Sequence, residues 1–388
     1  MNGYNLFKNL TWYPPAETKI SWSAILSAFT RSSGDFKNKL CNYLGVSQCV
    51  LANSGRALLY LLLNTLKKRD EERRDEILVP GYTCYSVAAS IAKAGLKINV
   101  YDLDPATLQP DFNSLRKATS EKTLAIIFQH LSGIPTSGYE FKKIAQETGV
   151  PLIEDAAQAL GGSIDSHRLG TIGDFGLFSF GRGKPLPIGG GGALIGNNND
   201  ILSELELKLS NKGYDSLIST ALTQVMSKPS IYWIPEMLPL GLGETIFDTG
   251  FDTSAMQSVI QNLAGNSMDT LDELNAHRRD IAKTYEEAFD DECVIPFPEG
   301  GSAVYTRFPL MVKQGQIPGE LKRLGVRRMY PKAIADEETI RLHLVDDPVP
   351  TPGASEIAGN LITLPTHMGI TQTLAREIAS KVAAMCQF

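Results

Sequence analysis

The chain of 388 residues is longer than one typical domain and long enough for two. Its hydrophobic fraction of 43% and charged fraction of 21% are typical of a water-soluble globular protein. Because the net charge is −6, composition gives no reason to expect nucleic acid or an anionic membrane as a partner. The five cysteines show no C-x-x-C spacing, which argues against a disulfide framework and against a metal site.

The sequence shows no sign of export or of membrane insertion. Residues 1–4 lack a charged segment followed by an apolar run, so we expect no signal peptide. No stretch reaches ~18 uninterrupted apolar residues, so we expect no membrane-spanning helix. These features predict a cytoplasmic protein.

Between residues 50 and 197, short apolar runs alternate with helical patterns. The runs predict buried strands at residues 77–79, 98–101, 124–128 and 152–153. Helices are predicted between them, at residues 57–68, 86–94, 111–118 and 139–148. This alternation indicates parallel strands joined by crossover helices, an α/β architecture. Ligands of such sheets bind at the carboxyl ends of the strands, where this chain places Ser54, Thr83, His130 and Asp155.

A helix is predicted over residues 201–209, followed by an apolar segment over residues 217–242. Its prolines, Pro229, Pro235 and Pro239, break any long helix. We expect this segment to pack on the body of the protein, on a partner subunit or on a substrate. A membrane-surface role is disfavoured because the segment has almost no Lys or Arg.

The rest of the chain predicts a smaller α/β unit. A helical pattern covers residues 257–289 with a break near Gly265, strands are expected at 305–312 and 361–364, and helices at 318–324 and 371–385. We therefore predict a large domain over residues 1–255, with an apolar insertion at about 210–250. A small C-terminal domain follows over residues 256–388.

Three short motifs carry the chemistry. A buried strand ends in Glu154 and Asp155, and a carboxylate there is costly unless it pairs with a buried cation. Lys184 follows 29 positions after Asp155, in a glycine-rich loop that leaves another apolar strand, and an amine so placed suits Schiff-base chemistry. Ser54 and Gly55 open a helix whose free N–H groups suit a phosphate, and Arg56 adds a cation.

Each of these motifs alone is weak, because glycine-rich turns, capping serines and surface lysines are common. Their order is more specific. Pyridoxal 5′-phosphate (PLP) needs one partner for its phosphate, one for its ring nitrogen and one for its aldehyde. The three motifs supply these partners, so the constellation predicts a PLP enzyme.

The chain resembles the DegT-type sugar aminotransferases, a branch of the fold-type I PLP-dependent transferases. The resemblance is dense over about residues 25–200 and loose over 255–388. The matching segments are Ser54-Gly55-x-Ala57-Leu58, Val79-Pro80-x-Tyr82-Thr83, Tyr101-Asp102-Leu103-Asp104, His130-Leu131-x-Gly133-x-Pro135, Glu154-Asp155-Ala156-Ala157-Gln158-Ala159, Gly170-Thr171-Ile172-Gly173-Asp174, Phe178-Ser179-Phe180-x-x-Gly183-Lys184 and Leu364-Pro365-Thr366-His367-Met368. It implies a large domain with a mainly parallel mixed sheet between helices and a smaller C-terminal α/β domain.

The resemblance also implies roles for particular residues. Lys184 binds the PLP aldehyde and later moves a proton, while Asp155 keeps the ring nitrogen protonated. Gln158 faces the ring near its phenolic oxygen. Ser179 holds the phosphate together with Ser54, Gly55 and Arg56. Relatives with His in place of the lysine act as sugar dehydratases, and Lys184 argues against that branch.

Three departures from the family pattern limit this transfer. Where the family often has an aromatic ring that stacks on the cofactor, the chain has Cys84 followed by Tyr85, so either Tyr85 or Tyr82 takes over or the stack is lost. Arg56 stands where the family usually has Thr. Residues 250–253 replace the family's Asn-x-Arg motif, whose Asn reaches the neighbouring subunit's phosphate, and we hypothesise that Arg56 compensates.

The resulting prediction is a homodimeric, PLP-dependent aminotransferase. It would move an amino group from an amino acid, glutamate in our expectation, to a nucleotide-linked keto-sugar in polysaccharide or secondary-metabolite biosynthesis. Arg327, Arg328 and Tyr330 lie where the family meets its sugar, whereas His130 is interpreted mainly as a packing residue. The alternatives are a dehydratase-like PLP enzyme and a non-catalytic regulatory protein on the same scaffold.

Overall fold

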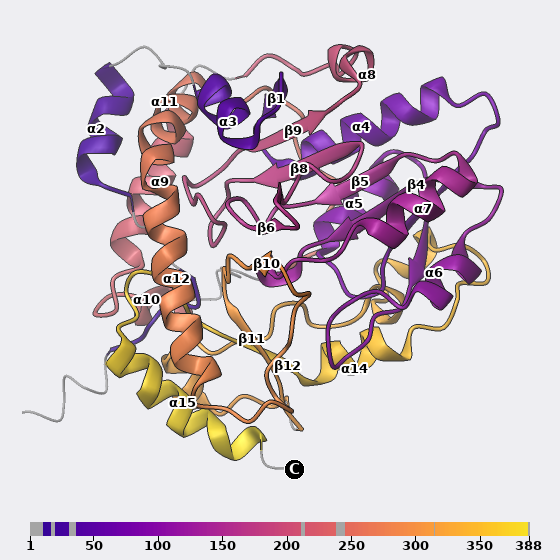
Figure 1. The fold of residues 1–388 in the computed structure, drawn as a ribbon. Helices are drawn as coiled ribbons and strands as arrows, with labels where there is room; N and C mark the ends of the chain where they lie inside the picture. Colours follow the sequence, from indigo (N-terminus) through magenta and orange to yellow (C-terminus); the bar gives the residue numbers. More distant parts are fainter. Residues whose placement is uncertain are drawn as a thin grey trace, which may run out of the picture.

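The computed structural model describes residues 11–16, 20–30, 36–210, 214–237, 245–313 and 315–386. A seven-stranded sheet in the order β1-β9-β8-β5-β4-β2-β3 lies at its centre (Figure 1). Its strands are β1 (Cys49–Ala52), β2 (Glu76–Pro80), β3 (Lys97–Tyr101), β4 (Thr123–Gln129), β5 (Leu152–Asp155), β8 (Phe175–Ser179) and β9 (Gly192–Gly196). Within this sheet only β9 runs against the other strands, since β1 and β8 both pair with it antiparallel and the remaining pairs are parallel. This mainly parallel mixed sheet confirms the predicted fold class.

The apolar core forms two clusters, one on each face of this sheet. Ile126 and Phe128 of β4 belong to one cluster, whereas Ala125 and Ile127 belong to the other, as the alternation of side chains along a strand requires. One cluster is covered by α4 (Gly55–Arg69), α5 (Tyr85–Lys93) and α8 (Asn199–Ser203). Residues of α3 (Phe36–Leu44), α6 (Phe112–Ala118), α7 (Tyr139–Thr148), α11 (Ser258–Ser267) and α12 (Leu271–Glu286) contribute to the other.

The segment after β9 differs in part from its prediction. Helix α8 ends at Ser203, so the helix predicted over residues 201–209 is wrong beyond that point, and Lys208 forms a β-bridge with Ser254 instead. The apolar segment forms α9 (Asp215–Met226), which ends before Pro229, and the short α10 (Trp233–Met237). The last residues of this segment, 238–242, lie outside the described residues.

The C-terminal part contains a second, separate sheet. Strand β11 (Phe308–Met311) pairs antiparallel with β12 (Leu361–Leu364), and α15 (Gln372–Cys386) lies beside α12 (Figure 1). Helices α13 (Gly319–Arg323) and α14 (Pro352–Asn360) complete this part. The helical pattern of residues 257–289 breaks at the 3-10 turn Met268–Thr270, which begins three residues after Gly265, a buried residue of α11.

Two contacts tie the C-terminal part to the preceding part of the chain. Helix α11, which follows the proposed domain boundary at residue 255, packs against α2 (Trp22–Thr30) and α3, which precede it. The position of this boundary therefore stays a prediction. A three-stranded sheet joins β10 (Gly301–Ser302) to β6 (Ser163–Ile164) and β7 (His167–Arg168). These two-residue strands are too short to leave a period in the sequence, which is why no pattern predicted them.

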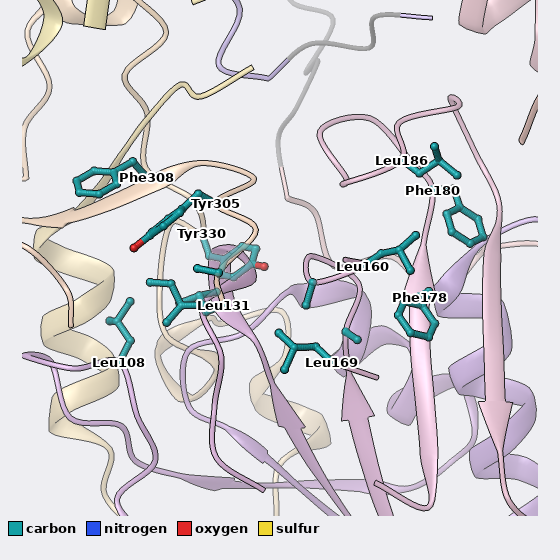
Figure 2. Close-up of a cluster of buried hydrophobic side chains, with 14 of the residues drawn as sticks. Leu108, Leu131, Leu160, Leu169, Phe178, Phe180, Leu186, Tyr305, Phe308 and Tyr330 are labelled. Carbon is teal, nitrogen blue, oxygen red and sulfur yellow. The ribbon is translucent and has the colours of Figure 1, made fainter. Parts of the chain in front are cut away.

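One buried apolar cluster extends from one face of the central sheet into the C-terminal part. Figure 2 shows Tyr305, Phe308 and Tyr330 of the C-terminal part beside Leu131, while Phe178 and Phe180 project from the β8 side. This packing brings Tyr330 to the edge of the sheet where ligands of α/β proteins bind. None of the helices in the described ranges is long and apolar enough to cross a membrane.

Candidate active site

A cavity of about 220 Å³ lies at the carboxyl ends of β5 and β8. Eight of the nine predicted site residues line it, namely Ser54, Gly55, Arg56, Cys84, Asp155, Gln158, Ser179 and Lys184. The remaining lining residues are Leu59, Ser86, Val87, Ala157, Leu177 and Tyr330. The predicted residue outside the lining is Tyr85. The structure therefore gathers an amine, a carboxylate and a helix N-terminus around one space.

The N-terminus of α4 forms one wall of this cavity. The Ser54 side chain caps the helix by accepting a hydrogen bond from the Ala57 N–H at 3.3 Å. Gly55 permits a close approach of three elements, because a Cβ at Gly55 would lie 3.1 Å from the Phe178 carbonyl oxygen and one at Gly192 would lie 2.4 Å from the Gly55 nitrogen. A helix start held this tightly presents its remaining N–H groups as an anion site.

Arg56 adds a cation to this wall, and its position is fixed by an aromatic neighbour. Its guanidinium lies 4.9 Å from the centre of the Phe251 ring, and the Lys93 ammonium lies 4.4 Å from the same ring. Phe251 belongs to the stretch that replaces the family's Asn-x-Arg motif. Its neighbour Asp252 accepts a hydrogen bond from Asn53 Nδ2 at 2.9 Å. Residues 250–253 thus hold both Arg56 and Asn53 in place.

Asp155 provides the carboxylate of the cavity. Its Oδ1 accepts a hydrogen bond from the Ala157 N–H at 3.0 Å. Burial raises the pKa of Asp155, while the charge of Lys184, the Ala157 N–H and His130 lower it by smaller amounts. A carboxylate that is so poorly solvated is stabilised when a cation such as a protonated ring nitrogen is placed against it.

Lys184 lies in a tight loop between β8 and β9. Gly183 takes a left-handed backbone, φ +74°, and the Lys184 N–H bonds the Gly181 carbonyl at 3.2 Å. Arg278 of α12 holds the loop from the other side. It donates to the Pro185 carbonyl at 3.0 Å and to the Lys184 carbonyl at 3.5 Å, and burial lowers its pKa to about 10.

Gln158 and Tyr330 form a linked pair on the cavity wall. Gln158 Nε2 donates to the Tyr330 hydroxyl at 3.1 Å, while Oε1 accepts from the Ser132 N–H at 3.1 Å and from the Thr306 hydroxyl at 3.3 Å. Because both ends of the amide are bonded, its orientation is fixed. Burial raises the pKa of Tyr330 well above its ordinary value, so its hydroxyl keeps its proton.

The aromatic residues considered for stacking on a cofactor ring lie elsewhere. Tyr85 is the first residue of α5, and its hydroxyl donates to the Lys332 carbonyl at 3.1 Å. Tyr82 is fully buried and donates to the Tyr330 carbonyl at 3.3 Å. The structure therefore corrects the prediction of Tyr85 as a cofactor-site residue, because helix α5 turns its side chain into the core. Cys84 occupies the cavity wall at this point.

His130 is a hydrogen-bonded interior residue. Its Nδ1 accepts from the Thr136 N–H at 3.0 Å, so Nε2 carries the proton that is donated to Glu154 Oε1 at 2.7 Å. The Glu154 carboxylate also accepts three backbone N–H groups, from Gly170, Ile172 and Gly173, at 2.5, 2.6 and 2.9 Å. This network fixes the end of β5 and therefore the place of Asp155.

The residues present fit PLP. The Gly55 and Gly192 backbones approach so closely that a side chain on either would disturb the helix start, Asp155 offers a desolvated carboxylate, and Lys184 offers an amine on the same cavity. Over the described ranges, no group of three or more His, Cys, Asp or Glu residues is arranged to hold a metal ion.

Comparisons with known proteins point to one family. Residues 20–383 match the model of the DegT/DnrJ/EryC1/StrS aminotransferase family. An uncharacterised protein of Methanocaldococcus jannaschii is 28% identical over 257 residues, covering 66% of this chain and 61% of that protein, so the match spans less than two thirds of that relative. The dTDP-4-dehydro-2,3,6-trideoxy-D-glucose 4-aminotransferase of Saccharopolyspora spinosa is 27% identical over 355 residues, covering 89% of this chain and 87% of that protein.

The fold is also similar to that of solved structures. The structure of DesI in the presence of its TDP-sugar product superposes with a TM-score of 0.75 at 20% identity, covering 97% of this chain and 93% of that chain. The family match extends over nearly the whole sequence and includes every predicted site residue. This chain belongs to the DegT/DnrJ/EryC1/StrS aminotransferase family, whose members depend on PLP.

Proposed function

We propose that this protein is a PLP-dependent aminotransferase that transfers an amino group from an amino acid, glutamate in our expectation, to a nucleotide-linked keto-sugar. The observation that carries the proposal is the single cavity that joins Lys184, Asp155 and the N-terminus of α4. When bound, PLP supplies an aldehyde that accepts the amino group and a ring that takes up the electron pair of the substrate carbon.

The protein's own groups have separate tasks in this scheme. Ser54, Gly55, Arg56 and Ser179 bind the phosphate end of the cofactor, and Asp155 pairs with its protonated ring nitrogen. Lys184 supplies the amine that binds the cofactor and then moves a proton at the substrate carbon. The Gln158 amide, whose orientation is fixed, and the protonated Tyr330 hydroxyl would orient the cofactor ring.

A groove beside the cavity supports a nucleotide-linked acceptor. It has a volume of about 910 Å³ and is lined in part by Lys322, Arg327, Arg328 and Tyr330. Tyr330 also lines the cofactor cavity, so the two spaces share a wall. Cations suit a diphosphate, and the names of relatives such as the GDP-perosamine synthase of Caulobacter vibrioides point to sugar nucleotides.

The first experiment is an absorption spectrum of the purified protein with PLP, before and after borohydride. We expect a visible band that borohydride abolishes, that is absent in Lys184→Ala and that persists in Lys142→Ala, an exposed lysine of α7. Glutamate should then convert the bound cofactor to its amino form with release of 2-oxoglutarate. The proposal fails if the native protein and Lys184→Ala give the same spectrum, or if no common amino acid yields its oxo-acid.

A further inference from the structure

One turn of helix α12 contacts both of the chain segments that carry the ends of the proposed cofactor site. Asn275 and Arg278 lie three residues apart on this helix and are 1% and 6% exposed. Side chains at this spacing are neighbours on a helix surface. Asn275 contacts the segment after β5, which carries Asp155, and Arg278 contacts the loop after β8, which carries Lys184.

Arg278 binds the Lys184 loop through its backbone. Its Nη1 donates to the Pro185 carbonyl at 3.0 Å and to Asn275 Oδ1 at 2.7 Å, and its Nη2 donates to the Lys184 carbonyl at 3.5 Å. These three acceptors are neutral oxygens, and burying a cation among neutral groups costs free energy. Packing alone therefore does not explain an arginine here, whereas its several planar N–H donors, which reach separate acceptors at once, do.

Asn275 extends this chain of hydrogen bonds to the segment after β5. Because its Oδ1 accepts from Arg278, its Nδ2 is the group that donates to the Leu160 carbonyl, at 3.0 Å. Gly161 permits the contact, since it takes a φ of +95° and a Cβ there would lie 2.2 Å from Asn275 Nδ2. The backbone thus approaches α12 more closely than any residue with a side chain would allow.

Leu160 is connected to Asp155 through two consecutive hydrogen-bonded turns. The Ala159 N–H donates to the Ala156 carbonyl, and the Gly162 N–H donates to the Ala159 carbonyl, both at 2.9 Å. A contact that holds the Leu160 carbonyl therefore also restrains the end of β5, from which the Asp155 carboxylate enters the cofactor cavity.

Helix α12 is itself firmly placed, so it can serve as a support for these two segments. The Tyr43 hydroxyl of α3 donates to Asp272 Oδ1 at 2.7 Å, and Leu271 and Ile281 are buried in the core. The helix also packs against α15 of the C-terminal part (Figure 1). Contacts with other elements therefore fix α12 along its length.

We propose that Asn275 and Arg278 form one positioning unit, which fixes the backbones of Lys184 and Asp155 relative to each other. Both side chains act through backbone carbonyls, so they influence a cofactor only indirectly. The inference rests on the proposed function, in which Lys184 binds the aldehyde of PLP and Asp155 pairs with its ring nitrogen. Because these groups meet different atoms of one rigid ring, an error in their relative position weakens both contacts.

PLP titration of four variants tests this unit: Asn275→Ala, Arg278→Met, the double variant and Arg279→Met. We expect Asn275→Ala and Arg278→Met each to lower PLP affinity roughly tenfold, because each loses hydrogen bonds that involve a charged group. The double variant should bind PLP about as well as Arg278→Met alone, because residues that act as one unit are not additive. Arg279→Met removes the neighbouring, half-buried arginine of the same helix and should bind PLP as the native protein does.

Hydrogen exchange of the ligand-free proteins shows whether the unit acts through position. Arg278→Met should speed amide exchange in residues 181–188 and 156–162, because Asn275 also loses its orienting partner, whereas Asn275→Ala should act mainly on 156–162. A general loss of stability would instead speed exchange throughout α12 and α15. Arg278→Lys keeps the charge without the planar donors and should restore only part of the protection. If Arg278→Met does not fold, Arg278→Lys and Asn275→Ala decide.

Two kinds of result would overturn the positioning unit. One is native PLP affinity in Asn275→Ala, or losses of affinity that add in the double variant. The other is unchanged exchange in both segments, or faster exchange spread evenly over the protein.

These outcomes are distinguishable from failure of the proposed function. If the native protein forms no bond between Lys184 and PLP, the aminotransferase is removed, and the exchange of the ligand-free variants still decides whether α12 fixes the two segments. If the native spectrum is as expected and both variants behave like Arg279→Met, the aminotransferase remains and the positioning unit is wrong.

Discussion

At the scale of single residues, Asp155 has opposite effects on the ligand-free protein and on cofactor binding. Burial raises its pKa in the fold. The folded state therefore holds the proton more tightly than the unfolded state. The stabilising effect of this group is complete below the unfolded pKa, about 3.9, and is lost as the pH rises through the raised folded value.

Asp155→Asn should therefore stabilise the ligand-free protein at neutral pH and weaken its affinity for PLP. The gain in thermal stability should shrink as the pH falls to about 4 and disappear below it, because the native carboxyl then becomes protonated in both the folded and the unfolded state. Thermal unfolding of ligand-free protein across this pH range measures the first effect, and PLP titration measures the second. Asp291→Asn, at an exposed position, is the control for loss of one charge. A destabilised Asp155→Asn at neutral pH would contradict the pKa direction.

Among the residues proposed to bind the cofactor phosphate, Arg56 departs most clearly from the family pattern. Arg56→Ala should lower PLP affinity about tenfold, because one charge-assisted hydrogen bond to phosphate is lost. Arg69→Ala removes an arginine from the other end of the same helix, where it pairs with exposed Glu204, and should leave PLP affinity unchanged. Equal affinity in both variants would mean that Arg56 does not compensate for the missing Asn.

At the scale of elements, one buried carboxylate fixes the turn that precedes β8. Glu154 accepts the Gly170, Ile172 and Gly173 N–H groups together with His130. Glu154→Gln replaces an acceptor oxygen by a donor that faces these N–H groups, so we expect a loss of about 1–3 kcal/mol in the free energy of unfolding. Denaturant unfolding measures it, and Glu147→Gln on the surface of α7 is the control. A loss below that of the control would mean that the turn holds without the network.

The sequence predicted the elements whose pattern is local. Asp155, Lys184 and Ser54 each follow an apolar run, and the ends of such runs are defined by neighbours in the chain. Arg278 was not predicted because it acts on Lys184 across 94 positions and lies in a charged stretch that is typical of an exposed helix. Tyr85 was misplaced for a similar reason. Its direction depends on where α5 begins and on Lys332, 247 positions away.

At the scale of the whole molecule, two neighbouring helices expose rows of large apolar side chains. Helix α2 exposes Trp22, Leu26 and Phe29 by 50, 65 and 49%, and α9 exposes Ile218 and Leu222 by 53 and 58%. The Phe29 ring lies 5.2 Å from that of Tyr214, which joins the two rows. Helices α2 and α9 both contact α11 and lie with it at the same side of the molecule in Figure 1, so we infer that the two rows belong to one face.

This face is where we expect the predicted homodimer to form. The double variant Leu26→Glu with Leu222→Glu places charges in the middle of both rows, and burying unpaired charges costs several kcal/mol. Sedimentation equilibrium should therefore show a dimer for the native protein and a monomer for the variant. Leu342→Glu is the control, because this leucine is 93% exposed and belongs to neither row. A dimeric double variant would place the interface on another face, and a monomeric native protein would remove the homodimer itself.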